Sequence, residues 1–152
     1  MVRILCLSLL ALCLAGSADA RAQAQDRGLE ALTIVSASGR HPFLVEVADT
    51  DADRAQGLMY RRHLAADHGM LFDFGKTEMV SMWMQNTYIP LDMLFLRADG
   101  SIARIARNTE PLSTRVISSG EPVPFVLEVS AGTASRLGLE PGDRVEHPRL
   151  KR

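Results

Sequence analysis

The sequence predicts a mostly β fold of the α+β class: a compact, single-domain β-sandwich or barrel-like structure with two short helices. Apolar runs of strand length recur between residues 31 and 147, and turn-forming residues separate them. Only two stretches have the apolar spacing of a helix. About 130 residues follow a removable leader, which is enough for one hydrophobic core and argues against a second domain.

The first 20 residues are predicted to be a secretory signal peptide. A positively charged start precedes an apolar run over 4–14, which is shorter than the roughly 20 residues of a membrane-spanning helix. An A-x-A cleavage pattern ends at Ala20. Both cysteines, Cys6 and Cys13, lie in this segment, so no disulfide is expected in the mature protein. The predicted localisation is therefore periplasmic or secreted.

Residues 21–30 are predicted to be a flexible leader, 31–148 the single domain and 149–152 a short tail. The net charge is −1, with 17 basic and 18 acidic residues, and no basic block stands out. Nucleic acid is therefore not an expected partner. No later segment of the sequence is apolar enough for a membrane span, and no cofactor or metal motif is present. A monomer is expected, with an unidentified ligand or a cell-envelope protein as its partner.

The first elements are predicted to be a β-hairpin followed by a helix. Apolar residues alternate over 32–36 and over 43–47, and a glycine-containing turn separates the two runs. Thr50 can cap a helix that runs to about Arg62. Gly57 in the middle of this helix costs about 1 kcal/mol relative to Ala, which indicates a close approach by another backbone.

The rest of the chain is predicted to consist mainly of strands. They are expected at 70–74, 80–84, 91–96, 102–107, 115–117, 125–129 and 144–147. Turns are expected at Gly75, Asp99-Gly100 and Gly120, and Asp99-Gly100 is the strongest hairpin signal among them. A second short helix is expected over 131–137.

Several motifs occur in order along the chain. They read R-A-Q-G-L-M-Y-R (54–61), G-M-L-F-D-F (69–74), W-M-Q-N-T-Y-I-P-L-D-M-L-F (83–95), V-L-E-V-S-A-G (126–132) and L-G-L-E-P-G-D-R-V (137–145). This combination resembles the family called domain of unknown function 192, over roughly residues 31–147. The resemblance implies a small β-rich fold that is often exported. It implies no reaction, because the family is named for lacking one.

Asp92 is the first candidate for a functional residue. It lies in the run 91–96, which is apolar on both strand faces, so its carboxylate is expected to be buried. A buried carboxylate needs hydrogen bonds or a counter-charge. As a structural anchor, Asp92 would accept hydrogen bonds from the Asn86-Thr87 turn or pair with an arginine. As a functional group, it would be a general base or a ligand anchor in a pocket beside Trp83.

Glu128 is the second candidate. It shares one strand face with Val126, while Phe125, Leu127 and Val129 share the other, so Glu128 would point outward or into a cleft. If Glu128 and Asp92 faced one cleft, they could divide acid and base roles between them, as in glycoside hydrolysis. The alternative, which we favour, is a salt bridge from Glu128 to an arginine.

The arginines and aromatic residues complete the candidate pocket. Arg54 and Arg61 are seven residues apart, so a helix would place them on one side. They could bind an anionic ligand, or they could neutralise the two carboxylates, which is the interpretation we favour. Trp83 is interpreted as a core residue, with a stacking platform for a ligand as the alternative.

Methionines suggest a further possibility. Met79, Met82 and Met84 could bind Cu(I) through their thioethers, although flexible Met side chains also fill gaps in a core. The sequence thus favours a cell-envelope binding or accessory module whose ligand rim includes Trp83, Asn86, Thr87 and Asp92. With Glu128, Arg54 and Arg61, these are the seven candidate pocket residues. A hydrolase that uses Asp92 and Glu128 is the first alternative, and copper binding is the second.

Overall fold

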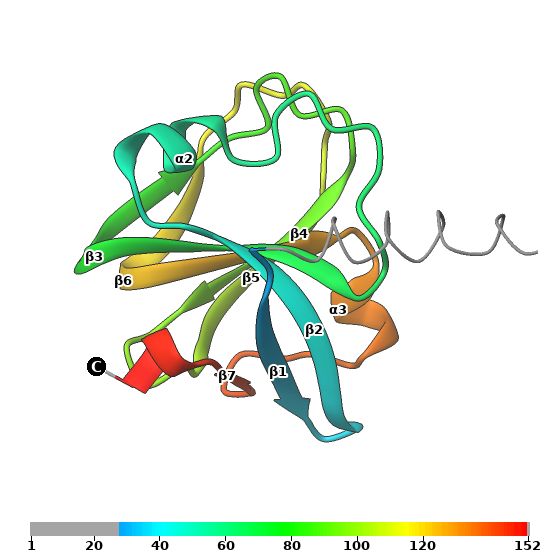
Figure 1. Ribbon diagram of the computed structural model, residues 1–152, viewed down its shortest axis with the longest axis vertical. Coiled ribbons are helices and arrows are strands. Elements are labelled where there is room, and N and C mark those ends of the chain that lie inside the picture. The colour runs from blue at the N-terminus through cyan, green and yellow to red at the C-terminus, as the bar shows by residue number, and fades with distance from the viewer. Residues whose placement is uncertain (1–27, 152) are drawn as a thin grey trace, which may run out of the picture.

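A computed structural model describes residues 28–151, and the predicted signal peptide lies outside these residues. One seven-stranded sheet curls into a barrel-like shape (Figure 1). Its strand order is β5-β4-β6-β3-β2-β1-β7. A bridge between Ser101 and Arg144 joins the two ends of the sheet, at the start of β5 and in β7. The predicted mostly β, barrel-like fold is confirmed.

Residues 28–151 form mainly strands, with three short helical segments. The strands are β1 (Glu30–Ser36), β2 (Gly39–Ala48), β3 (His68–Met82), β4 (Leu91–Leu96), β5 (Ile102–Thr109), β6 (Ile117–Ser130) and β7 (Arg144–Glu146). The helices are α2 (Asp51–Gln56), α3 (Thr133–Arg136) and the 3-10 turn η1 (Pro148–Lys151). The two predicted hairpins are present, since β1 pairs with β2 and β4 pairs with β5, both antiparallel. Between β2 and β3, which pair in parallel, the chain crosses over through α2.

β4 and the last half of β6 are buried on both faces of the sheet, so both candidate carboxylates lie inside the protein. Side chains alternate between the faces along a strand. In β4, Leu94 and Leu96 pack into one apolar cluster, while Met93 and Phe95 pack into the other. The first cluster, the barrel core, also contains side chains of β1, β2 and β7. The second, the upper core, lies against the segment that follows α2 and includes Leu58.

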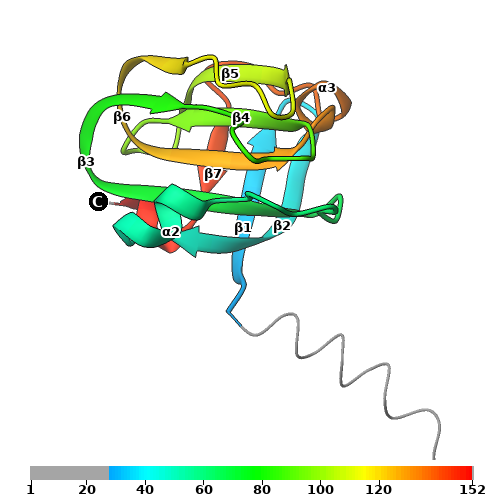
Figure 2. The same ribbon diagram turned by 90° about the horizontal axis from the view of Figure 1, so that it is seen from above.

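Two predicted turns are wrong. Gly75 and Gly120 do not end strands: β3 and β6 run through them, and register shifts between the two strands accompany each bend. Figure 2 shows β3 curving from one layer of the molecule into the other. Both glycines have φ between 70 and 82°, which lets the long β3–β6 pair fold back over the upper core.

The first helix is shorter than predicted. α2 begins after Thr50, whose side chain accepts a hydrogen bond from the Asp53 N–H, as the sequence indicated. It ends at Gly57, whose φ of 49° stops the helix. A Cβ at Gly57 would lie 3.0 Å from the Phe72 ring, so the close approach there is by a side chain rather than by another backbone.

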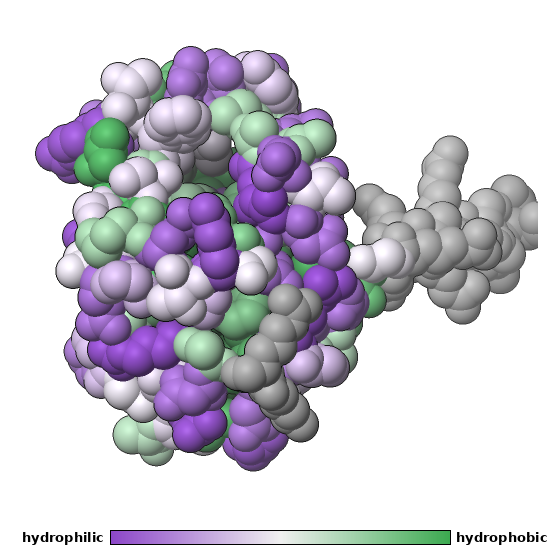
Figure 3. Space-filling model, turned by 90° about the vertical axis from the view of Figure 1, so that its left-hand side faces the viewer, coloured by the Kyte–Doolittle hydropathy of each residue, from purple (hydrophilic) through white to green (hydrophobic). Residues whose placement is uncertain are grey.

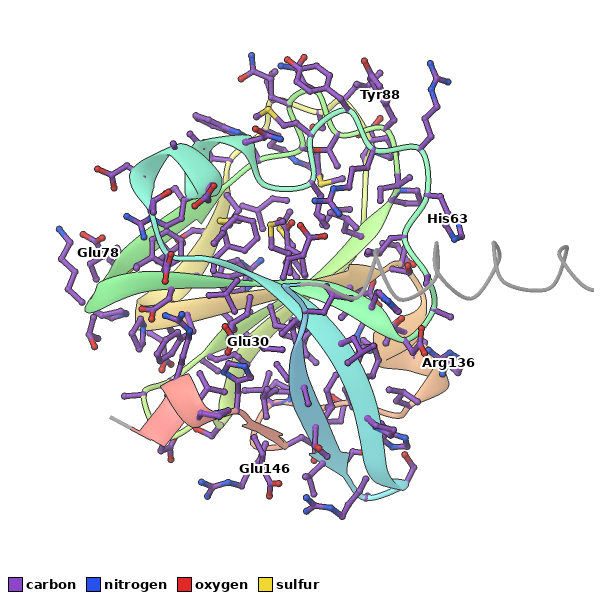
Figure 4. The ribbon with its side chains drawn as sticks, viewed as in Figure 1. Glu30, His63, Glu78, Tyr88, Arg136 and Glu146 are labelled. Carbon is purple, nitrogen blue, oxygen red and sulfur yellow. The ribbon has the colours of Figure 1, made fainter. Side chains whose placement is uncertain are left out.

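Three connecting segments meet at one end of the barrel. The Tyr60 N–H donates to the Asn86 carbonyl at 2.8 Å, and the Leu112 N–H donates to the Thr87 carbonyl at 3.1 Å. Figure 4 labels Tyr88 at this end, at the top of the view. Tyr60, Asn86 and Leu112 all have positive φ, which is costly for residues other than glycine and is held here by these cross-links.

Candidate functional site

Glu128 lies at a pocket between α2, the following turn and the folded-back part of β3. The pocket volume is about 120 Å³. Four of the seven candidate residues line it: Arg54, Trp83, Thr87 and Glu128. The other lining residues are Ala55, Gln56, Gly57, Leu58, Met59, Phe72, Phe74, Ser81 and Met82. The walls are therefore largely apolar and aromatic, and Glu128 contributes a carboxyl group.

The carboxyl group of Glu128 has an unusual environment. The residue is only 4% exposed, and burial raises the pKa of Glu128 to about 8. Within residues 28–151, no hydrogen bond or ion pair reaches its side chain. The group is thus mostly protonated at neutral pH, and as a carboxylic acid it can donate one hydrogen bond and accept others. The prediction of a salt bridge between Glu128 and an arginine is therefore wrong.

The two arginines are fixed by other partners. Arg54 Nη1 donates to the carbonyl oxygens of Asp49 and Asp73, both at 2.6 Å, and its Nη2 lies 2.5 Å from an Asp51 carboxylate oxygen. Arg61 pairs with Glu46 through both of its terminal nitrogens. The prediction that these arginines neutralise Asp92 and Glu128 is therefore wrong. Arg54 instead fastens α2 to β3 at one wall of the pocket.

Trp83 is half exposed, at 51%, so its interpretation as a core residue is wrong. It follows the last residue of β3 and lines the same pocket as Glu128. Thr87 is buried and also lines it. Asn86 does not line the pocket; its amide nitrogen lies 3.9 Å from the Met59 sulfur, and its backbone supports the turn below Tyr60. Figure 3, seen from the side that carries α2, shows hydrophilic and apolar side chains interspersed on the surface around this region.

Asp92 is fully buried, as predicted, but its partners differ from those expected. Its Oδ1 accepts from the Asn108 N–H and its Oδ2 from the Ala134 N–H, both at 2.8 Å. The N-cap of α3 is Gly132, which has no side chain to accept from the first turn. Asp92 supplies that acceptor from a distant strand and also fixes the end of β5. It is a structural anchor.

Asp92 and Glu128 lie on opposite faces of the sheet. In the β4–β6 pair, Asp92 is opposite Val129, and Met93 is opposite Glu128. Directly paired residues share a face and neighbours along a strand alternate, so Asp92 points toward the barrel core and Glu128 toward the upper core. The two carboxyl groups do not line one cleft, and this arrangement does not support the paired-acid hydrolase.

The three methionines do not converge. Met79 is exposed, Met82 lines the Glu128 pocket, and Met84 is fully buried, with its sulfur 3.1 Å from the Thr109 hydroxyl. They therefore do not form the copper site considered from the sequence. Among the described residues, no group of three or more His, Cys, Asp or Glu side chains is arranged to hold a metal ion.

Comparison with known proteins assigns the chain to a family. The family model DUF192, described as "Uncharacterized ACR", matches residues 33–147. This chain belongs to the DUF192 family. The resemblance noted in the sequence is confirmed, and the residues that line the Glu128 pocket all lie within the matched range. None of the curated proteins matches the chain.

Solved structures similar to this DUF192 protein include the following two. One is a Sinorhizobium meliloti protein described provisionally as a transcription regulator, with 55% identity and a TM-score of 0.76; the match covers 78% of this chain and 92% of that chain. The other is a protein of unknown function from Novosphingobium aromaticivorans, with 40% identity and a TM-score of 0.76, covering 78% of this chain and 85% of that chain.

Several residues that line the pocket of this DUF192 domain were not predicted from the sequence. Phe72 and Phe74 come from the early part of β3, and Met59 comes from the turn after α2. Their apolar character indicated only that they would be buried. The useful signal was Gly57, because a glycine in a helical pattern marks a close approach, and the group that approaches is the Phe72 ring beside the pocket.

Proposed function

We propose that this protein is an exported ligand-binding module of the cell envelope. Its ligand would insert a small, largely apolar group that accepts a hydrogen bond from the Glu128 carboxyl. The observation that carries this proposal is the environment of Glu128: a buried, mostly protonated carboxyl group at an apolar pocket, without a protein partner among the described residues. A few polar groups in a largely apolar pocket commonly orient its ligand, and no protein group among the described residues occupies the Glu128 carboxyl.

The size and lining of the pocket narrow the ligand class. A cavity of about 150 Å³ holds one benzene-sized molecule, so a pocket of about 120 Å³ takes a group the size of an amino-acid side chain. Trp83 at the rim can cover the rest of the ligand with its exposed face. An uncharged amide suits the site best, because it can exchange two hydrogen bonds with a protonated carboxyl group.

Export is supported by the sequence of the first 20 residues, with cleavage near Ala20. None of the helices in residues 28–151 is long and apolar enough to span a membrane. The Sinorhizobium protein is described provisionally as a transcription regulator. The present chain has a net charge of −1 and no basic block in its sequence, so DNA is not favoured as its partner.

The proposal can be tested with small probes and intrinsic fluorescence. Trp83 is the only tryptophan in the chain, so its emission reports on the pocket directly. Propionamide is titrated at pH 6.5 and pH 9, with propylammonium as a cationic comparison. We expect propionamide to bind at pH 6.5 and to weaken at pH 9, since Glu128 loses its proton near pH 8.

Two variants separate the hydrogen bond from the shape of the pocket. Glu128→Leu should abolish propionamide binding, whereas Glu128→Gln, which keeps a donor, should retain it. Glu78→Gln is the matched control, because Glu78 is a partly exposed acid near the bend of β3 (Figure 4). Equal binding by Glu128→Leu would contradict the proposal. Binding of propylammonium that strengthens above pH 8 would instead identify a cation site.

A further inference from the structure

We infer that a second site, a basic cleft along the free edge of β5, binds an extended acidic peptide by adding it as a strand. The cleft is separate from the Glu128 pocket and has a volume of about 670 Å³, within the range of ligand-binding clefts. Five consecutive residues, Arg104 to Asn108, line one side. The segment from Arg115 to Ser118, with Gly120, lines the other.

Both sides of this cleft are strand edges. β5 is at the end of the strand order and pairs with β4 on one side only. In the described residues, the other edge of β5 is bridged to β7 only beside the first residue of β5, through Ser101 and Arg144. The backbone of Ile102 also forms hydrogen bonds with the backbone of the turn at 142–143. Across the cleft, Ile117 and Ser118 pair with β3 on their far side. Unpaired strand edges bind extended peptides through main-chain hydrogen bonds.

The cleft has a closed end and an open end. Arg104 Nη1 donates to the Ser118 carbonyl, which ties the two edges together. A Cβ at Gly120 would lie 3.7 Å from Arg104 Cδ, so the edges are close at this point. From Arg104 to Thr109, β5 is at most about 17 Å long at the usual strand rise, because a register shift interrupts its pairing with β4 after Ala106. A peptide of about five residues therefore fits this length.

Charge selects an acidic peptide. Arg104, Arg107 and Arg115 line the cleft against one acidic residue, Glu110. Arg107 is partly neutralised by Glu140, at 3.2 Å. No ion pair with Arg104 or Arg115 occurs in the described part of the chain. The cleft therefore carries an uncompensated positive charge, in a protein whose net charge is −1.

The strand pattern also sets the spacing of the acidic residues. Arg104 lies over the ring of Phe95, a residue of the upper core, whereas Arg107 Nη2 donates to the carbonyl of Leu139, a residue of the barrel core. The two arginines therefore project from opposite faces of β5. A strand added beside them would place carboxylates against both when its acidic residues are likewise three apart. Val116 is 60% exposed at the opposite edge, so an apolar side chain between the acids would find a partner there.

The test uses a blocked five-residue peptide, Glu-Val-Thr-Glu-Val, and the ¹⁵N-labelled protein. We expect amide shifts at residues 104–108 and 115–118. Hydrogen exchange should slow at edge amides that are free in the unbound protein, but not at Asn108, whose N–H already donates to Asp92. Arg115→Glu should weaken binding by about fivefold to tenfold, as expected for replacing an exposed ion pair with a repulsion. Arg136→Glu, the matched control on α3 (Figure 4), should change it by less than about twofold.

Two peptide controls separate strand addition from simple charge attraction. The version with Gln in place of Glu should lose most of its affinity. The version with N-methyl groups at alternate residues keeps its charges but loses main-chain donors, and it should not bind. The inference is overturned if the N-methylated peptide binds equally well, if inorganic phosphate produces the same shifts, or if no shift maps to these two edges at about 1 mM peptide, a concentration that detects binding of roughly −4 kcal/mol.

Discussion

Replacement of Asp92 by Ala should strongly destabilise the domain. Each carboxylate oxygen accepts one N–H at 2.8 Å, and the side chain is fully buried. A hydrogen bond to a charged group contributes about 1.5–3 kcal/mol, and the substitution leaves both donors without an acceptor. We therefore expect the free energy of unfolding to fall by about 3–5 kcal/mol, a large part of the 5–15 kcal/mol typical of a folded domain.

Urea unfolding, followed by circular dichroism, measures this loss. The matched control is Asp99→Ala, because Asp99 also accepts two hydrogen bonds, from the Ser101 N–H and hydroxyl, but is exposed. Asp99→Ala should cost about 1 kcal/mol or less. A loss below about 1 kcal/mol for Asp92→Ala, with an unchanged m-value, would refute the anchoring role that the structure assigns to this carboxylate.

Three further predictions concern neighbouring features. The folded-state pKa of Glu128, about 8, is above its ordinary value of 4.5, so its contribution to stability is present in full below pH 4.5 and is lost as the pH rises to 8. Glu128→Gln should therefore be more stable than the wild type at pH 8, by up to about 4 kcal/mol, and similar to it at pH 4.5; a pH-independent difference in urea unfolding would contradict this. Gly69→Ala should destabilise by at least about 2 kcal/mol, because the added Cβ would lie 2.5 Å from the Glu128 carbonyl oxygen; a melting temperature like that of the wild type would rule this out. A double-mutant cycle for Arg61 and Glu46 should give a coupling free energy of about 1 kcal/mol or less, because solvent screens this pair: the two side chains are 34% and 38% exposed. A much larger coupling would contradict this screening.

The fold could be predicted from the sequence where local signals agree. The Asp99-Gly100 turn joins β4 and β5 as expected, and the bounds of β4 match the predicted 91–96 run. The prediction failed at glycines, which can form either a turn that ends a strand or a bend within one. Gly75 and Gly120 indicated strand ends, but they allow continuous strands to bend, because a positive φ serves a turn and a bend equally well.

The candidate site was predicted only in part. Four of the candidate residues line one pocket, but the ion pairs assigned to them were wrong. Partners such as Glu46 for Arg61, or the Ala134 N–H for Asp92, depend on which strands are neighbours in the sheet. That order is a property of the whole chain, and local patterns do not determine it.

The alternation of side chains in β6 predicts the strand face of Glu128 but not how Glu128 lies relative to Asp92. The sequence placed Glu128 on the face of Val126, opposite Leu127 and Val129. It did not reveal that both faces are buried or that β4 pairs with β6 so that Asp92 lies beside Val129. This one register decides that Asp92 is an anchor in the barrel core and that Glu128 faces the pocket.

The most direct test of the proposed binding site is a titration of Glu128 itself. The side-chain carboxyl ¹³C shift of Glu128 can be followed by NMR from pH 4 to pH 10, and the Glu128→Gln variant assigns the signal. We predict a midpoint near 8, which shifts upward when propionamide is bound because the ligand favours the protonated form. A midpoint near the ordinary value of 4.5 would contradict the account, because the carboxyl group would then be charged and solvated at neutral pH.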